Sequence, residues 1–183
     1  MIILASKSPR RRELMKQITP LFDVFDSDID EDKYRSLPPI EACKAISYHK
    51  ALVAKEKFMD DTIVSADTIV VLDKKIINKP KNKRDAYDIL KKLSNKTHEV
   101  ITAFTIMKGG LDVTNIVISK VVFNDLSDEL INDYIASGSP LDKAGAYGIQ
   151  DNERFPIVKS YEGSYDNIVG FPVKEIKETL ESM

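Results

Sequence analysis

The sequence predicts an α/β fold with a mixed sheet flanked by helices, and two features of the chain carry this prediction. Apolar segments with the strand period and with the helix period alternate along the first half of the 183 residues. They are followed by two long strand runs, 97–107 and 111–123, which Gly109 and Gly110 join as a hairpin signal. Strand–helix–strand units pair in parallel whereas a hairpin pairs antiparallel, so the sheet should contain both directions.

Composition and charge place the chain among ordinary globular proteins. Hydrophobic residues make up 43% and charged residues 31%, and we expect one domain over 1–183 with a sizeable core. The net charge of −2 argues against binding to a nucleic acid polymer, which needs a basic surface. No apolar run reaches membrane-spanning length, and the apolar start is too short for a signal peptide, so we expect a cytoplasmic protein with no membrane partner.

The scarcity of cysteine and histidine argues against several kinds of site. Cys43 is the single cysteine, so no intrachain disulfide can form, and with only His49 and His98 a zinc cage is not expected. Neither histidine lies near a nucleophile motif, so we interpret both as structural and expect no Ser-His-Asp chemistry. The sequence also contains no glycine-rich phosphate loop of the ATPase kind and no dinucleotide fingerprint.

The beginning of the chain has the features of an anion site. Residues 2–5 are a predicted buried strand, and Ser8 and Pro9 suit the N-cap and the first position of a following helix. Arg10 and Arg11 fall in the first turn of that helix, where cations oppose the helix dipole. Two successive arginines beside a serine-rich turn therefore indicate a phosphate that offsets the repulsion.

The next segments add an acidic loop and a long helix. Residues 21–25 are a predicted strand, and the acidic run 26–32 after it is by default a solvated connection. The alternative is a carboxylate for a divalent cation, although the run lacks the glycine and the final glutamate of an EF-hand loop. In the helix predicted over 40–58, Lys50 shares the apolar face, and it either extends to solvent or binds a phosphate.

The most continuous apolar run, 62–72, is the predicted central strand, and it contains a carboxylate at Asp67. An ionised carboxylate in an apolar layer without partners is costly, so such a residue is normally paired, metal-bound or protonated. Asp67 is therefore either a structural residue that accepts hydrogen bonds from the backbone or a catalytic carboxylate. The strand alone does not decide between these two readings.

The second half of the chain contributes one more cation and a glycine-rich segment. Lys79 precedes Pro80, so it lies on an extended loop. Residues 144–150, spaced by glycines, are a predicted strand or loop that a ligand or another backbone approaches closely. The remaining predicted elements are helices over 82–94, from Ser127 to Gly138, after Tyr165 and after Pro172, and a last strand over 155–161.

Together these residues indicate phosphate chemistry. Cations drawn from separate segments suit a polyanionic small ligand such as a nucleoside triphosphate. The carboxylates suit a divalent ion that bridges phosphates and a base that orients water. From the residues alone we expect hydrolysis of a phosphate ester or anhydride. The residues that carry this expectation are Arg10, Arg11, Glu31, Lys50, Asp67 and Lys79.

Sequence motifs are distributed along nearly the whole chain. They are Leu4-Ala5-Ser6-Lys7-Ser8-Pro9-Arg10-Arg11-Arg12-Glu13-Leu14, Ser65-Ala66-Asp67-Thr68, Lys79-Pro80, Thr97-His98-Glu99-Val100-Ile101-Thr102, Ala144-Gly145-Ala146-Tyr147-Gly148-Ile149-Gln150 and Gly163-Ser164-Tyr165 through Gly170-Phe171-Pro172. In this order they resemble the Maf (septum formation) family. The resemblance implies an elongated mixed sheet with a cleft between two lobes, a fold shared with the inosine triphosphate pyrophosphatases. It also implies hydrolysis of nucleoside triphosphates to monophosphate and pyrophosphate with Mg²⁺ or Mn²⁺, usually in a homodimer.

The resemblance assigns roles to individual residues of this sequence. It makes Asp67 the general base and places a divalent metal at Glu31 and Asp67. Within the acidic loop, Asp28, Asp30 and Asp32 are rivals to Glu31 as the metal ligand. A substrate-binding role passes to Ser6, Arg10, Arg11, Lys50, Thr68, Lys79 and Gln150.

The segment that ends in Gln150 resembles the branch of the family that acts on dTTP and UTP. A carboxamide offers a donor and an acceptor that match a uracil or thymine edge, and we expect Thr68 and Arg10 to line the same pocket. Modified pyrimidine nucleotides are further candidate substrates, in nucleotide-pool cleansing or cell-division control. The competing class is a nucleotide-binding regulator of septum formation without turnover, and the carboxylate in the buried strand favours catalysis.

Overall fold

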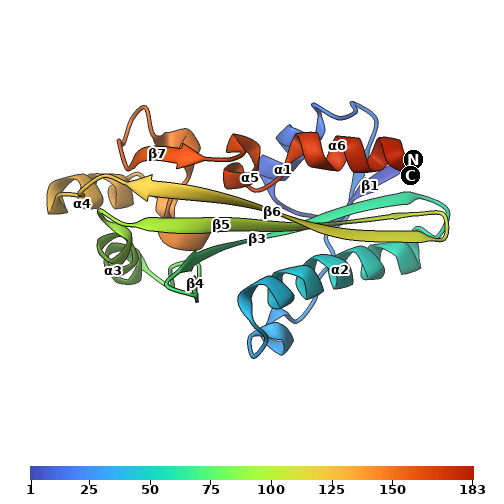
Figure 1. Ribbon diagram of the computed structural model, residues 1–183, viewed down its shortest axis with the longest axis horizontal. Coiled ribbons are helices and arrows are strands. Elements are labelled where there is room, and N and C mark those ends of the chain that lie inside the picture. Colours follow the sequence, from blue (N-terminus) through green and yellow to red (C-terminus); the bar gives the residue numbers. More distant parts are fainter. The chain divides into compact units, whose positions relative to one another are not determined.

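Seven strands and six α-helices make up the chain, and a computed structural model describes all of its residues, 1–183 (Figure 1). The strands are β1 (Ile2–Leu4), β2 (Asp23–Val24), β3 (Thr62–Leu72), β4 (Lys75–Ile77), β5 (Thr97–Lys108), β6 (Leu111–Phe123) and β7 (Val158–Glu162). The helices are α1 (Pro9–Met15), α2 (Pro39–Lys57), α3 (Lys83–Leu93), α4 (Asp128–Ala136), α5 (Tyr165–Val169) and α6 (Val173–Ser182). Four 3-10 turns are η1 (Glu31–Tyr34), η2 (Ser139–Asp142), η3 (Ala144–Ala146) and η4 (Ile149–Asp151).

All strands belong to one mixed sheet. Its order is β2-β1-β3-β5-β6-β7, with β4 paired to β3. β1 pairs in parallel with both β2 and β3, whereas the β3–β4 and β6–β7 pairs are antiparallel. The prediction of a mixed α/β sheet is therefore confirmed. No helix is both long and apolar enough to cross a membrane.

Three segments differ in detail from the sequence-based prediction. The strand expected over 21–25 shortens to β2, and Leu21 before it has 73% of its surface exposed. The strand expected over 155–161 begins only at Val158, because Pro156 has no backbone N–H and the Ile157 N–H bonds within a local turn to the Phe155 carbonyl at 2.8 Å.

The segment predicted over 144–150 as a strand or a loop forms the turns η3 and η4 and no strand. Gly145 has a φ of +72°, which reverses the backbone there. A Cβ at this position would also lie 3.0 Å from Val70 Cγ2, so glycine is needed for the close approach of the segment to β3.

The chain divides into two compact units. The first comprises 1–68, 102–117 and 170–183, and the second comprises 69–101 and 118–169. β3, β5 and β6 therefore contribute residues to both units.

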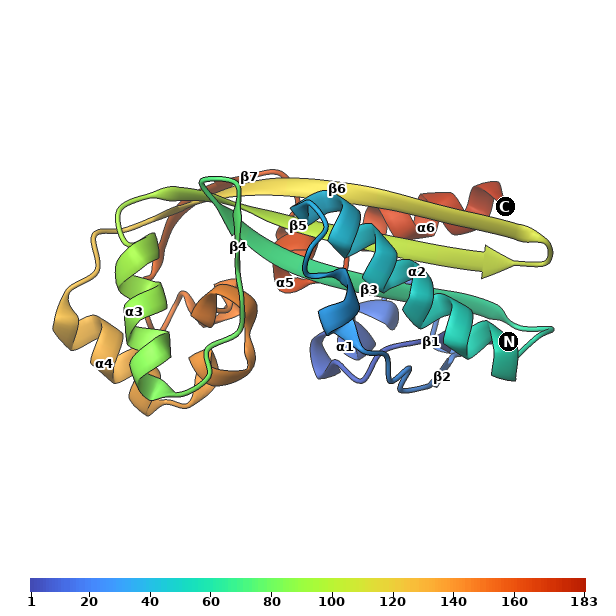
Figure 2. The same cartoon turned by 90° about the horizontal axis from the view of Figure 1, so that it is seen from below.

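In the first unit, α2 lies on one side of the strands and α6 on the other (Figures 1 and 2). α2 begins at Pro39, where the missing N–H of proline costs nothing because the first turn has no intrahelical partner. Its buried residues recur at a spacing of three and four, which gives the helix one face toward the sheet. Side chains from β1 and the residue after it, α2, β3 and β5 form a core cluster of this unit: Ile3, Ala5, Ala51, Ala54, Ile63 and Met107.

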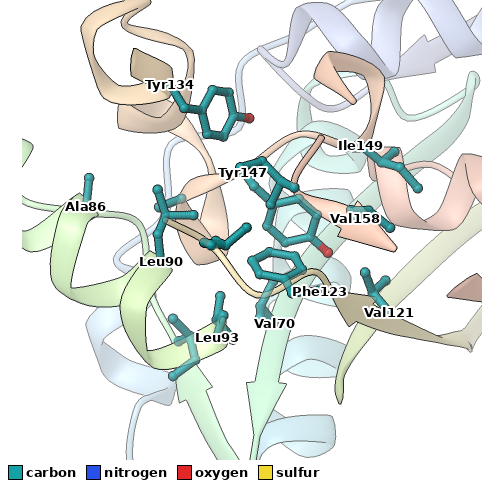
Figure 3. Packing of buried hydrophobic residues seen from close by; sticks show 14 of the residues in the cluster. Val70, Ala86, Leu90, Leu93, Val121, Phe123, Tyr134, Tyr147, Ile149 and Val158 are labelled. Carbon is teal, nitrogen blue, oxygen red and sulfur yellow. The ribbon is translucent and has the colours of Figure 1, made fainter. Parts of the chain in front are cut away.

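The second unit has its own apolar core, shown in Figure 3. Leu90 and Leu93 of α3 pack there with Phe123 of β6 and with Tyr147 from the segment between η3 and η4. The rings of Phe123 and Tyr147 meet edge to face with their centroids 4.7 Å apart. This core holds the 144–151 segment, in which Gln150 is located.

Candidate active site

Asp67 lies in the middle of β3, directly after the fully buried Ser65 and Ala66. The side chain of Asp67 is only 13% exposed, and its Oδ1 lies 3.8 Å from Lys50 Nζ. Lys50 follows Ile46 by one turn on the buried face of α2, so the helix directs its side chain to β3. With 17% of its side chain exposed, Lys50 does not extend freely into solvent.

Glu31 gives Lys50 a second carboxylate partner. The distance from Glu31 Oε1 to Lys50 Nζ is 3.0 Å. Asp30 is instead the cap of η1 and accepts a hydrogen bond from the Asp32 N–H at 3.1 Å, while Asp32 pairs with Arg35 at 2.9 Å. Glu31 is therefore the one of these three loop carboxylates that lies next to the lysine of Asp67.

Burial and charge act in opposite directions on Asp67. Removal of the carboxylate from water raises the pKa of Asp67 above its ordinary value, and this is the largest effect. The positive charges of Lys50 and Arg11 lower this pKa, and the negative charge of Glu31 raises it. A carboxylate with a raised pKa holds a proton more strongly than a free Asp, which suits a general base.

Arg11 places a fixed positive charge beside Asp67. Its Nε donates a hydrogen bond to the Gly170 carbonyl at 2.8 Å, and its Nη2 donates to Thr68 Oγ1 at 3.1 Å. Thr68 Oγ1 is also 2.8 Å from Thr102 Oγ1. Burial lowers the pKa of Arg11 and the charge of Asp67 raises it, yet a guanidinium keeps its proton in proteins.

The N-terminal turn and α1 contain Ser6 and Arg10. Ser8 Oγ accepts a hydrogen bond from the Arg11 N–H at 3.3 Å, so Ser8 is the N-cap of α1, as predicted. Ser6 Oγ accepts a hydrogen bond from the Ser8 N–H at 3.1 Å, and Ser6 is buried. Arg10 is near enough to Arg11 for its charge to lower the pKa of Arg11.

Three further residues, Cys43, Thr102 and Gly170, contact the side chains or backbone of the candidate site, and none of them was assigned a role there from the sequence. The thiol of Cys43 donates a hydrogen bond to the Asp67 carbonyl at 3.1 Å, and burial raises the pKa of Cys43 so that it stays protonated. The sequence could have indicated this contact, because Cys43 lies on the same face of the predicted helix as Lys50. Thr102 and Gly170 belong to the quoted motifs, but nothing in the sequence indicated their contacts, because Gly170 meets Arg11 across 159 residues of sequence.

The carboxylates of Glu31 and Asp67 fit a hard divalent cation. Mg²⁺ is usually bound in proteins through one or two carboxylates together with substrate phosphates and water. Glu31 and Asp67 flank the same ammonium group of Lys50 and supply oxygen donors of this kind. No group of three or more Asp, Glu, His or Cys side chains could hold a metal ion, so a divalent cation at Glu31 and Asp67 stays a prediction.

Lys79 and Gln150 belong to the second unit, and their substrate-binding roles stay predictions. Lys79 is exposed on the loop after β4, and the Asn78 carbonyl before it accepts a hydrogen bond from the Gly145 N–H at 3.4 Å. Gln150 is exposed within η4. The predicted residues that the structure places around one point in the first unit are Arg11, Glu31, Lys50, Asp67 and Thr68.

Comparison with known proteins gives matches over nearly the entire chain. A dTTP/UTP pyrophosphatase from Pyrococcus furiosus is 44% identical over 180 residues, which cover 98% of this chain and 94% of that protein. Proteins of the same name from Alkaliphilus metalliredigens and Thermosipho africanus are 43% and 44% identical over 182 and 179 residues. These alignments cover 98% of this chain in both cases, and 94% and 91% of the two relatives.

The sequence profile described as "Maf-like protein" matches residues 1–183. It thus includes the segments that carry Lys50 and Asp67 as well as those that carry Lys79 and Gln150. With a match over its full length and relatives above 40% identity, the chain belongs to the Maf family.

Proposed function

We propose that the chain hydrolyses nucleoside triphosphates to monophosphate and pyrophosphate, with dTTP and UTP as the preferred class. The observation that carries this proposal is the position of Lys50, whose Nζ lies 3.0 Å from Glu31 Oε1 and 3.8 Å from Asp67 Oδ1. The dTTP/UTP pyrophosphatases among the relatives supply the substrate class. Modified pyrimidine nucleotides are included as further candidates.

In the proposed reaction, a water oxygen forms a bond to the α-phosphorus and Asp67 accepts the proton of that water. The bond from the α-phosphorus to the bridging oxygen breaks, and pyrophosphate leaves with the electron pair. Lys50 and Arg11 offset the negative charge that develops on the phosphate oxygens. Glu31 and Asp67 would hold a Mg²⁺ or Mn²⁺, which would supply further neutralisation of the phosphates.

Release of pyrophosphate separates this proposal from the alternative of a nucleotide-binding regulator. Purified protein is incubated with Mg²⁺ or Mn²⁺ and UTP, and an added inorganic pyrophosphatase converts pyrophosphate to phosphate for colorimetric detection. We expect phosphate to appear only when the added pyrophosphatase is present. If calorimetry shows that UTP binds while no pyrophosphate is released, the chain is a regulator and not an enzyme.

Gln150 is proposed to select the base. Its amide can pair with the carbonyl and the N–H of uracil or thymine, and a site built on such bonds rejects bases that leave them unpaired. We expect turnover of UTP and dTTP to exceed that of CTP, ATP and GTP, and Gln150→Ala to reduce this preference. Glu153→Ala, at an exposed position three residues after Gln150, is the matched control. Equal turnover of ATP and UTP by the wild type would contradict the assignment.

A homodimer that acts in the cytoplasm, in nucleotide-pool cleansing or cell-division control, completes the proposal. Both features come from the family resemblance. Sedimentation velocity tests the dimer, for which we expect twice the mass of one chain over the micromolar range. A single species with the mass of one chain would remove the dimer from the proposal and leave the reaction untouched.

A further inference from the structure

The hydroxyl of Tyr134 contacts the chain on both sides of Gln150. It accepts a hydrogen bond from the Gly148 N–H at 2.9 Å and donates one to Asp151 Oδ2 at 2.8 Å. Gly148 precedes Gln150 by two residues and Asp151 follows it directly, so one hydroxyl fixes both flanks of the turn η4. Tyr134 comes from α4 and is fully buried, and Figure 3 shows its hydroxyl pointing toward the segment that carries Tyr147 and Ile149.

Further hydrogen bonds connect Asp151, the acceptor of the Tyr134 hydroxyl, to the turn η2. Ser139 Oγ donates to Asp151 Oδ2 at 2.6 Å, so the same carboxylate oxygen accepts from two hydroxyls. Lys143 Nζ donates in turn to Ser139 Oγ at 2.9 Å and to the Ser139 carbonyl at 2.7 Å. The cation of Lys143 thereby contributes to a chain of donors that ends at the carboxylate of Asp151.

The side chain of Gln150 is itself packed against this arrangement. A Cβ at Gly148 would lie 2.9 Å from Lys143 Cε and 3.0 Å from Gln150 Nε2, so both side chains rest against the bare backbone of Gly148. Gln150 is nonetheless exposed, whereas Ile149 before it is buried. The amide of Gln150 is therefore the part of the side chain that rests against Gly148, while the residue stays exposed to a ligand.

We propose that Tyr134 is a positioning residue for base selection, whose hydroxyl holds Gln150 in the orientation that recognises a uracil or thymine edge. This inference rests on the proposed function. Base selection by an amide requires fixed directions for its donor and acceptor, since an amide that rotates freely can satisfy cytosine as well as uracil. Recognition groups act best when neighbouring hydrogen bonds fix them before the ligand arrives.

Tyr134→Phe tests the proposal, because it removes the hydroxyl and keeps the ring, which packs on Phe155 with centroids 5.0 Å apart. The measurement is the ratio of kcat/KM for UTP to that for CTP, with Mg²⁺ present. We expect this ratio to fall about tenfold, the effect of one or two lost hydrogen bonds. The loss should arise from a higher KM for UTP, with kcat changed less than twofold.

Tyr147→Phe is the matched control. It removes a second buried hydroxyl from the same core, one whose oxygen lies 2.7 Å from His98 Nε2 and does not bond to the flanks of Gln150. The two variants should lose similar stability, but Tyr147→Phe should keep the wild-type ratio. The proposal is overturned if Tyr134→Phe keeps that ratio, or if both variants lower it equally through a general loosening of the core.

A double variant and a milder variant decide the remaining cases. In a Gln150→Ala background, Tyr134→Phe should lower the ratio no further, and an additional independent loss would overturn the proposal. Should Tyr134→Phe not fold, Asp151→Asn weakens the acceptor of the Tyr134 hydroxyl and keeps the tyrosine, and an unchanged ratio in that variant overturns the proposal. Failure of the wild type to release pyrophosphate from UTP would instead reject the proposed function, so the two failures are distinct.

Discussion

Asp67 and His98 are both buried titratable side chains, but their surroundings are opposite in character. Asp67 in the first unit lies near Lys50 and Arg11, and its charge interacts with both. His98 in the second unit is 2% exposed and packs edge to face against the rings of Phe123 and Tyr147, with centroids 5.0 and 5.3 Å away. The Nε2 atom of His98 is 2.7 Å from the Tyr147 hydroxyl, a hydrogen-bond distance.

Burial alone therefore does not identify a catalytic group. Burial lowers the pKa of His98 to about 4, so the ring is neutral at physiological pH, and the aromatic rings around it offer no charge to alter that state. Burial also raises the pKa of Asp67, but the adjacent cations oppose the shift and can bind a phosphate anion. A perturbed residue indicates a site when its partners are themselves able to meet a substrate.

The largest effect that separates the two regions is expected from Asp67→Asn. The substitution keeps the shape of the side chain and removes the charge that accepts a proton, so UTP should still bind while kcat falls by about 10²–10⁴. Calorimetry measures binding, and pyrophosphate release measures turnover. Asp60→Asn, exposed on the loop before β3, is the control. An Asp67→Asn variant that keeps more than about a tenth of the wild-type rate would support a structural role.

Arg11→Ala is expected to have a smaller effect on the rate and a measurable effect on stability. Loss of a charge beside the phosphates should lower kcat/KM about a hundredfold. The variant also loses the hydrogen bonds to Gly170 and Thr68, and at about 1.5–3 kcal/mol for a bond from a charged donor its Tm should fall by several degrees. Arg12→Ala, exposed on the same helix, should change neither quantity. Full activity in an unstable Arg11→Ala protein would show that the residue acts only in folding.

For His98 we expect an effect on stability with acid and none on turnover at neutral pH. The ordinary pKa of 6.5 applies to the unfolded chain and the value of about 4 to the folded one. Between these values the unfolded state binds a proton that the folded state does not, so the stabilisation present above pH 6.5 is lost as the pH falls to about 4. The loss amounts to about 3 kcal/mol and levels off below pH 4.

Urea unfolding at several pH values, compared between the wild type and His98→Gln, isolates this contribution from those of the carboxylates. The wild type should lose more of its free energy of unfolding than the variant between pH 6.5 and 4. Parallel pH curves for the two proteins would show that His98 does not titrate as its surroundings indicate. A large loss of kcat in His98→Gln at pH 7 would contradict the view that His98 has only a structural role.

The sequence was informative where a single segment contains the signal. A carboxylate in an apolar strand identified Asp67, and the register of Lys50 on its helix placed it toward the sheet. His49 was predicted to be structural, and its Nδ1 lies 2.8 Å from the Ala45 carbonyl on the same helix.

Contacts between distant segments could not be predicted in this way. The carbonyl of Gly170 that receives Arg11 and the hydroxyl of Tyr134 that holds Gln150 depend on how the chain returns to itself. The acidic loop offered four candidate metal ligands, and only the folded structure, in which Glu31 begins η1, shows which one pairs with Lys50. The turns in 144–150 could not be predicted either. The positive φ of Gly145 turns the backbone there, so the segment does not form a strand.

The central claim is that water, activated at Asp67, attacks the α-phosphorus. Hydrolysis of UTP in water enriched in ¹⁸O, followed by mass spectrometry of both products after less than one turnover per site, tests it most directly. We predict one ¹⁸O atom in UMP and none in pyrophosphate, with the rate of incorporation lowered in Asp67→Asn as strongly as kcat. Label in pyrophosphate, or incorporation into UMP at an undiminished rate in Asp67→Asn, would contradict the account.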